Sequence, residues 1–229
     1  MSALFMRMSI SRIALSAAAV ATVLALGTTR TEAATLGFSC VTNNAASSCA
    51  IGQSQLSADL TDLGNGSVEF LFSNTGPGAS SMTQIYFDQP NPTLIALSSM
   101  NGSSGVSFRE LAGNRNLPGG NGIQFRATDG VGARPPVSLN GVNPGEWLRL
   151  IFTLNQGSTF ASLLTSLSTG DLRIGTHVQS IGGEGNSESF VNTAATVVPE
   201  PASMILLATG LAGAAAARRR RRQAAAQTA

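Results

Sequence analysis

Few side chains of this chain are placed to carry out catalysis. His177 is the only histidine, and nucleophilic catalysis would need it within hydrogen-bonding reach of a serine and a carboxylate. No serine occupies the Gly-x-Ser-x-Gly turn that exposes the nucleophile of many hydrolases. On a strand, His177 would share a polar outer face with Arg173 and Gln179. We therefore interpret it as a structural histidine and expect no catalytic residue; a secreted hydrolase is the least favoured alternative.

Two pairs of carboxylates could act together, but their spacing argues against catalysis. Asp59 and Asp62 would face opposite sides of one strand, whereas glycoside cleavage needs two carboxyls about 5–10 Å apart. Glu184 and Glu188 lie in a glycine-rich loop that does little to fix their geometry. Flexible loops suit calcium, so a calcium-binding module stays open as an alternative, although the spacing matches no familiar calcium loop. We predict no metal site and no cofactor.

The aromatic residues offer one further alternative, a carbohydrate-binding module. Trp147 could stack on a sugar ring, but aromatic residues make up only 5% of the chain and Trp147 starts an apolar run. Packing in the core is the favoured interpretation.

Cys40 and Cys49 are the only cysteines, and an even number in an exported protein indicates a disulfide. Closing so short a loop would restrain the unfolded chain by about 2–3 kcal/mol. The small polar residues between the two cysteines are typical of a hairpin or loop tip. A metal site built on the two thiols is the alternative, but it lacks further ligands.

The elements that must hold these residues are short strands, which predict an all-β fold, an antiparallel β-sandwich of jelly-roll-like or similar type. Ser67–Asn74 and Glu146–Leu154 alternate most clearly, and we expect them to be central strands of opposed sheets. Asn65-Gly66 favours a tight hairpin. The apolar spacing of Ser158–Gly170 predicts one short helix. The other expected strands are Gln55–Thr61, Gln84–Asp88, Thr93–Ser99, Gly105–Glu110, Gly122–Ala127, Asp171–Ser180 and Ser189–Asn192.

Charge is distributed unevenly along the chain. All 14 basic residues are arginines, and only six of them lie between Thr35 and Val197, where ten carboxylates stand against them. The body therefore carries a formal charge of about −4. Nucleic-acid binding, which needs a basic face on the folded part, is disfavoured.

The first 33 residues have the layout of a secretory signal peptide. Arg7 and Arg12 precede the apolar run Ile13–Leu26, and cleavage after Ala33 would leave small residues at the expected positions. An uncleaved anchor is the alternative, but the run is short for a membrane span, which needs about 20 residues. We expect a signal helix that engages the Sec translocon and signal peptidase.

The C-terminal end has three parts in a fixed order. Pro199, Glu200 and Pro201 form an extended segment. Ala202–Ala217 then carries no charge and predicts a membrane helix, which is slightly short for a bilayer core of about 30 Å. Five arginines follow and would keep the end of the chain cytoplasmic by the positive-inside rule: Arg218, Arg219, Arg220, Arg221 and Arg222.

This arrangement resembles the PEP-CTERM sorting signal of Gram-negative bacteria. The resemblance rests on Val198–Pro201, the apolar segment and the arginine cluster. It implies that exosortase, a membrane cysteine protease-transpeptidase, cuts near the motif and routes the protein to the cell surface, often in strains that make extracellular polysaccharide. It implies nothing about the activity of the body.

The sequence therefore predicts an exported, non-catalytic protein with a structural or adhesive role. Its expected course is an inner-membrane intermediate followed by the cell surface or extracellular matrix of a Gram-negative bacterium, where polysaccharide is a candidate partner. We expect a signal peptide over residues 1–33, an extracytoplasmic β-sandwich over 34–192, a linker over 193–197, the sorting signal over 198–222 and a cytoplasmic tail over 223–229.

Overall fold

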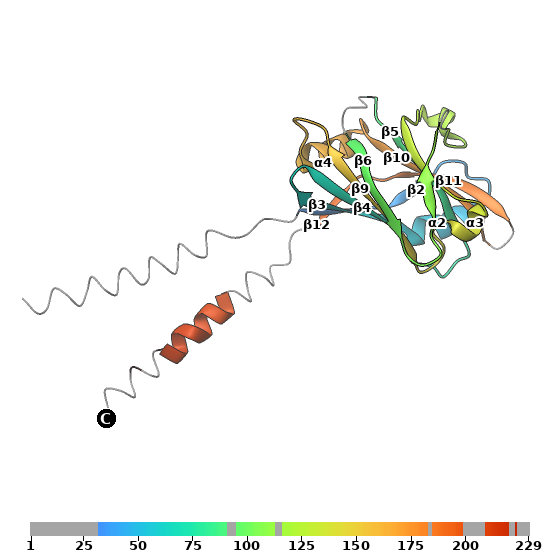
Figure 1. Cartoon of the computed structure of the whole chain (residues 1–229). Helices are drawn as coiled ribbons and strands as arrows, with labels where there is room; N and C mark the ends of the chain where they lie inside the picture. The colour runs from blue at the N-terminus through green and yellow to red at the C-terminus, as the bar shows by residue number, and fades with distance from the viewer. Residues whose placement is uncertain are drawn as a thin grey trace, which may run out of the picture. The chain divides into compact units, whose positions relative to one another are not determined.

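The chain between residues 32 and 198 forms two antiparallel sheets joined by loops and short helices (Figure 1). The structure is a computed structural model that describes residues 32–90, 95–112, 116–182, 185–198, 209–219 and 223. Within these ranges each sheet has six strands, and a few short helices join them. This confirms the predicted all-β class with antiparallel sheets.

The strands of each sheet come from distant parts of the chain. In spatial order, the first sheet consists of β12 (Thr196–Val198), β1 (Ala33–Leu36), β3 (Leu56–Gly64), β4 (Ser67–Asn74), β9 (Glu146–Leu154) and β6 (Ile95–Gly102). The second sheet consists of β2 (Phe38–Cys40), β11 (Asn186–Asn192), β10 (Arg173–Ile181), β5 (Ser81–Asp88), β8 (Asp129–Ala133) and β7 (Phe108–Glu110). The helices are α2 (Ala46–Gln55), η1 (Gly120–Ile123), α3 (Val137–Asn140) and α4 (Phe160–Thr169).

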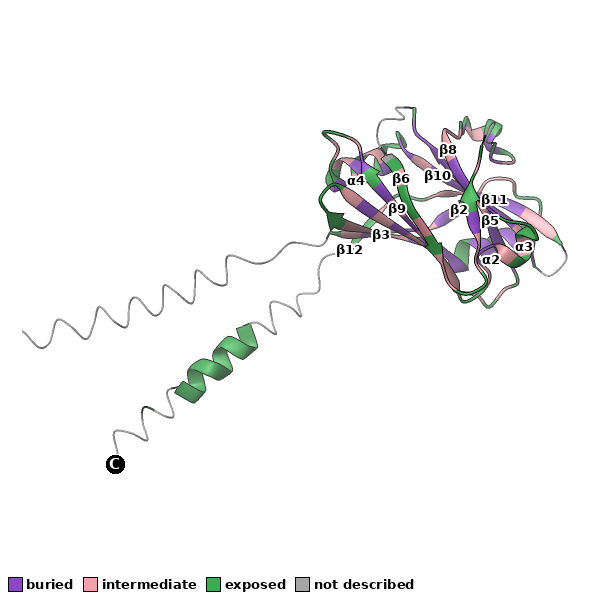
Figure 2. Cartoon of the chain, in the orientation of Figure 1, coloured by how far each residue is buried: buried purple, intermediate pink, exposed green. Residues whose placement is uncertain are grey.

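The two sheets share one apolar core. Every second residue of β4 is buried, as Figure 2 shows for the strands of this sheet, because successive side chains point to opposite faces. Phe87 from the second sheet contacts two rings of the first, with centroids 5.9 Å from Phe70 and 5.0 Å from Phe152. Edge-to-face contacts of this kind fix the two layers against each other.

The two most regular strands are neighbours, so the expectation that they belong to opposed sheets was wrong. β4 and β9 pair along their whole length, with Phe70 opposite Leu150. The alternation in each strand reports that one face is buried, and it carries no information on which sheet the strand joins.

The turns that depend on glycine or asparagine follow the sequence prediction. Asn65 and Gly66 both have positive φ, at 52° and 72°, and join β3 to β4 as a tight hairpin. The predicted helix is α4, which ends at Gly170 with φ 82°. Its N-cap is Thr159, whose hydroxyl accepts from the Ser162 N–H in a capping box, one residue after the expected Ser158.

Three segments differ from the prediction. The expected strand Gly122–Ala127 contains the end of η1 and a turn. The strand β8 lies within Asp129–Pro136, whose glycines and prolines are typical of a loop sequence. β8 lacks a strand pattern because its glycines let neighbouring groups come close to its backbone. A Cβ on Gly132, for example, would lie 2.8 Å from the Leu111 side chain. The expected loop tip between the cysteines instead leads into α2, which begins at Ala46.

Candidate functional site

The sorting segment starts at an edge of the first sheet. β12 is the edge strand next to β1, and the pairs are Ala33 with Val198, Ala34 with Val197, and Thr35 with Thr196. β12 has only three residues, and Val197 is 57% exposed. The body therefore holds the chain directly up to the residue before Pro199, through a short strand with one neighbour.

Two expected domain boundaries fall at strands of the first sheet. The expected linker, residues 193–197, ends inside β12, and the expected leader, residues 1–33, ends at the first residue of β1. β12 was not expected from the sequence, because three residues are too few to show a periodicity. The remainder of the leader lies outside the described residues.

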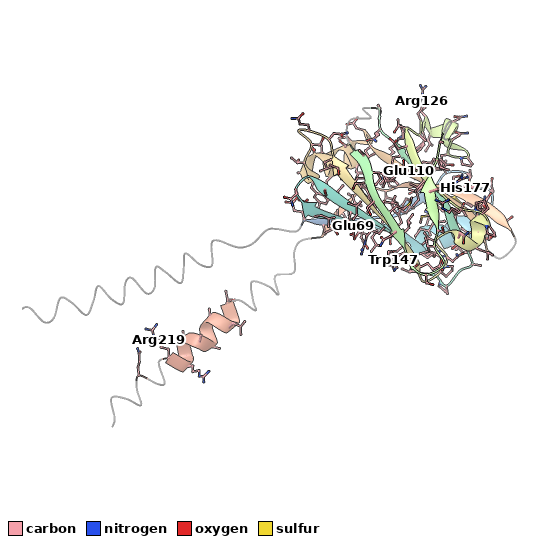
Figure 3. All side chains as sticks on the ribbon, in the orientation of Figure 1. Glu69, Glu110, Arg126, Trp147, His177 and Arg219 are labelled. Atoms are coloured by element: carbon pink, nitrogen blue, oxygen red, sulfur yellow. A yellow bond between two sulfur atoms is a disulfide. The ribbon has the colours of Figure 1, made fainter. Side chains whose placement is uncertain are left out.

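The tail beyond β12 is described only in part. A helix covers residues 209–219, and Arg218 and Arg219 lie in its last turn with exposed side chains (Figure 3). The motif residues Pro199, Glu200 and Pro201 and the arginines Arg220, Arg221 and Arg222 lie outside the described residues. Among the residues that the structure describes, no helix combines the length and the apolar character that crossing a bilayer requires.

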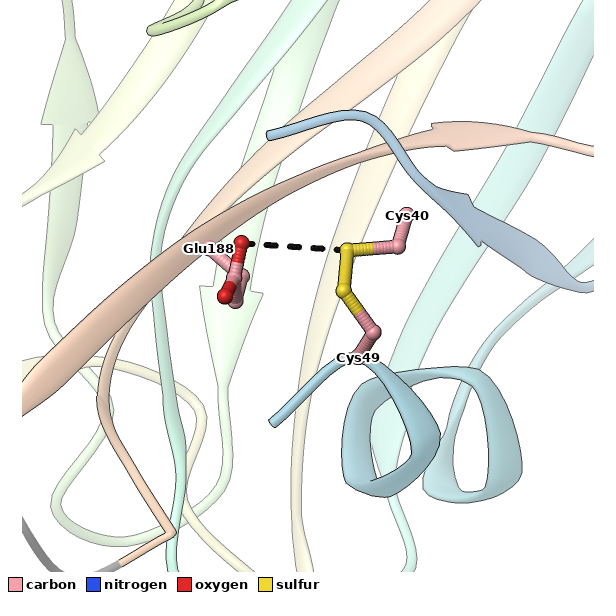
Figure 4. A group of neighbouring side chains, drawn as sticks. All are labelled: Cys40, Cys49 and Glu188. Carbon is pink, nitrogen blue, oxygen red and sulfur yellow. Dashed lines mark hydrogen bonds between the residues drawn. A yellow bond between two sulfur atoms is a disulfide. The ribbon is translucent and has the colours of Figure 1, made fainter. Parts of the chain in front are cut away.

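Cys40 and Cys49 form the predicted disulfide, which ties β2 to the first turns of α2 (Figure 4). Glu188 from β11 lies beside it and is fully buried, with its Oε2 3.8 Å from Cys40 Sγ. A disulfide sulfur has no proton to donate, so this is a contact rather than a hydrogen bond.

The oxygens of Glu188 are occupied by groups of the segment that follows β2. They accept hydrogen bonds from the Thr42 hydroxyl, from the Asn44 N–H at 3.0 Å and from the Ala45 N–H at 2.7 Å. Ala45 is the N-cap of α2 and has no side-chain oxygen to offer. Glu188 therefore caps the approach to α2 from a distant strand.

Cys40, Cys49 and Glu188 are three residues of types that bind metals, and their ligand atoms lie within 4.8 Å of one another. A metal would require thiolates, but the two sulfurs are bonded to each other and the carboxylate oxygens already accept protein donors. The arrangement is suited to holding β2, α2 and β11 together. The sequence named Glu188 only as a partner of Glu184; its position beside the disulfide was not predicted, because it lies 139 residues after Cys49 in the chain.

His177 is buried in the second sheet, with 8% of its surface exposed, and does not lie on an exposed polar face (Figure 3). Its Nδ1 is 3.3 Å from the hydroxyl of Ser189, the residue opposite it on β11. Burial lowers the pKa of His177, which favours the neutral ring. Ser189 is 0% exposed, so this pair offers no accessible nucleophile.

The remaining sequence candidates lie apart from one another. Asp59 accepts from the Thr35 hydroxyl at 2.7 Å, while Asp62 accepts from the Gly64 N–H at 2.9 Å, so each has a local structural partner. Glu184 lies outside the described residues. Trp147 is half-buried on the outer face of the first sheet, with the Arg149 guanidinium 5.4 Å from its ring centre and no place in the core.

The family model for the PEP-CTERM protein-sorting motif matches residues 197–222. No curated protein and no solved structure matches the chain significantly. The motif confirms the resemblance and defines the class: this is an exported protein that exosortase processes through a membrane-anchored intermediate. The chain is a PEP-CTERM-tailed protein whose match begins at Val197, inside β12.

Proposed function

We propose that this protein is delivered by exosortase to the cell surface or extracellular matrix of a Gram-negative bacterium, where its body is a non-catalytic β-sandwich with a structural or adhesive role. The observation that carries the proposal is the sorting motif, which starts at the edge strand of the folded body with no free linker before it. A signal peptide over residues 1–33 and a membrane helix over Ala202–Ala217 are the parts that this route needs.

The non-catalytic role is supported by the burial and hydrogen bonding of the side chains that could take part in catalysis. The one histidine and its serine neighbour are both buried, and a substrate cannot reach a nucleophile that has no exposed surface. The carboxylates Asp59, Asp62 and Glu188 are bound to nearby hydroxyls or N–H groups. A protein whose polar groups are used for its own fold fits a structural part better than an enzyme.

Export and sorting are tested together by replacing Pro199, Glu200 and Pro201 with alanine in the full chain, in a host that carries exosortase. The expected result is accumulation of the unprocessed protein in the inner membrane, measured by fractionation and by the mass of the chain. Glu110→Ala, a change at an exposed residue of the body, is the control and should be delivered normally. Normal surface delivery of the triple variant would contradict the proposal.

Carbohydrate binding is the second candidate for the body, and it is favoured by one observation. A cleft on the second sheet contains one arginine and two glutamines, and Trp147, on the first sheet, is not part of its lining.

A further inference from the structure

A cleft lies on the outer face of the second sheet, on the side away from the common core. Its volume is about 160 Å³, and β5, β7, β8, β10 and the region of α3 all contribute to its lining. The residues that the argument uses are Gln84, Arg109, Leu111, Gly132, Val137 and Gln179.

The register of the sheet places the polar groups in one row. Arg109 on β7 is opposite Gly132 on β8, Gly132 is opposite Gln84 on β5, and Gln84 is opposite His177 on β10. Residues opposite each other in antiparallel strands point to the same face. The neighbours Phe108 and Ile85 point into the core, so this row points outward.

Glycine at position 132 lets an apolar side chain lie over the middle of this row. Leu111, from the segment after β7, fills the space above the glycine, where a Cβ would lie 2.8 Å from its side chain. The row is therefore apolar at its middle, with Arg109 on one side and Gln84 on the other.

Both sides of the cleft are tied down. Residues 116–127 cover the neighbouring part of the sheet through Leu117 and Phe125, which pack on Tyr86. Arg173 holds this segment by pairing with Asp88 and donating to the carbonyl of Ile123 at 2.7 Å. On the other side, the Ser81 hydroxyl donates to the carbonyl of Ser138 in α3 at 2.8 Å.

Arg109 is the one charged residue of the lining. The ion pairs among the described residues join Arg149 to Glu69 and Arg173 to Asp88, and Arg109 takes part in neither. An unpaired guanidinium in a cleft whose lining holds no carboxylate is a site for an anionic group from outside. The fork of an arginine matches a carboxylate, which it can bind through two parallel hydrogen bonds.

We propose that this cleft binds a carboxylate-bearing sugar residue, as found in an acidic polysaccharide. Arg109 would take the carboxylate. The amide of Gln84, which both donates and accepts, and the NH₂ group of Gln179, whose Oε1 already accepts from the Ser138 hydroxyl at 3.5 Å, would take ring hydroxyls. Leu111 and Val137 would contact the apolar C–H faces of the ring. The volume is below the roughly 300–1,000 Å³ of drug-sized sites, so the cleft takes one sugar unit of a longer chain.

This inference rests on the proposed adhesive role and supplies its ligand class. An acidic peptide would also offer a carboxylate, but it would leave two neutral amides without matching hydroxyls. A sugar acid satisfies the charged group and both amides together.

The test measures binding of the full-length protein in mild detergent to galacturonic acid trisaccharide and to maltotriose, a neutral sugar of equal length. The acidic sugar should bind, and Arg109→Gln should weaken that binding at least about tenfold, the loss expected when a charged hydrogen-bond partner is removed. Arg126→Gln removes the same charge from an exposed residue outside the lining and should bind as the wild type does. Circular dichroism establishes that each variant is folded.

Four results would overturn the proposal: no binding of the acidic sugar, equal binding of maltotriose, equal binding of a peptide with a free carboxylate, or unchanged binding by folded Arg109→Gln. Surface delivery is measured on the same variants. Arg109→Gln should be sorted normally, so a failure of sugar binding with intact delivery refutes this inference and leaves the proposed sorting route standing.

Discussion

Ala34 pairs with Val197, so the first strand of the body holds the residue at which the sorting motif begins. The pair joins two positions that are 163 residues apart in the chain. Ala34 would also be the first residue of the exported protein after cleavage at Ala33. The expected cleavage site and the start of the sorting motif thus lie on paired strands of the same sheet.

Separating the motif from this edge should speed its processing. A protease acts on extended, unpaired backbone, and the three residues of β12 are bonded to β1. We expect a four-residue Gly-Ser insertion between Val198 and Pro199, which adds about 13 Å of reach, to raise the rate at which the tail is removed. Pulse-chase labelling measures that rate.

The same insertion placed after Gly66, in the hairpin between β3 and β4, is the matched control and should leave processing unchanged. Slower or absent processing with the insertion at Val198 would show instead that the enzyme requires the motif beside the sheet.

Removing the disulfide should destabilise the body. Replacing both Cys40 and Cys49 with serine frees a short loop in the unfolded chain, and we expect a loss of about 2–3 kcal/mol in the free energy of unfolding. Denaturant unfolding of wild type and variant measures the difference. A reductant should lower the stability of the wild type alone, and equal sensitivity in the variant would contradict this explanation.

Glu188→Gln should destabilise the body without changing its shape. The new NH₂ group would face N–H donors of Asn44 and Ala45 that now have an acceptor, and leaving one such donor buried and unpaired costs about 1–3 kcal/mol. Thermal unfolding measures the effect. The exposed change Glu110→Gln should stay within about 0.5 kcal/mol of the wild type, and equal effects would exclude the capping role.

His177 should make the body less stable in mild acid. Because burial lowers its pKa, the unfolded chain takes up a proton near the ordinary value of about 6.5 while the folded chain stays neutral. The free energy of unfolding is therefore unaffected by His177 above the unfolded pKa and declines as pH falls from there toward the folded pKa. His177→Gln should show a flatter dependence of unfolding free energy on pH across this range, and an identical slope would contradict the assignment.

Strands with a strong internal pattern were predictable from the sequence. The residues 67–74 alternate because one face meets the core, and Asn65-Gly66 supplies the positive φ that its hairpin needs. The structure assigns Ser67–Asn74 and Glu146–Leu154 to strands with the predicted bounds. Thr159 and Gly170 end α4 within one residue of the expected positions, since helix caps depend on local chemistry.

Elements stabilised by partners distant in sequence were not predictable. β8 contains two glycines and one large apolar residue, Val131, so it carries no alternation, and only its neighbours β5 and β7 make it a strand. β12 likewise depends on β1. α2 lacks an amphipathic pattern and is fixed by the disulfide and by Glu188.

The candidate sites divide in the same way. The disulfide and the sorting motif follow from residue type and short spacing, and both are confirmed. The row through Arg109, Gln84 and His177 depends on sheet register, which a single sequence does not reveal. His177 was placed on a polar outer face, and its direction agrees with the register, but only 8% of its surface is exposed.

The position of β12 has a mechanical consequence for a protein held at its C-terminal end. A pull on the chain beyond Val198 loads the pairing of β12 with β1 first. Residues 193–198, freed from β1, would span at most about 20 Å between β11 and the point of pull. The body would thus yield at one short strand under strain and keep its core, its disulfide and its cleft intact.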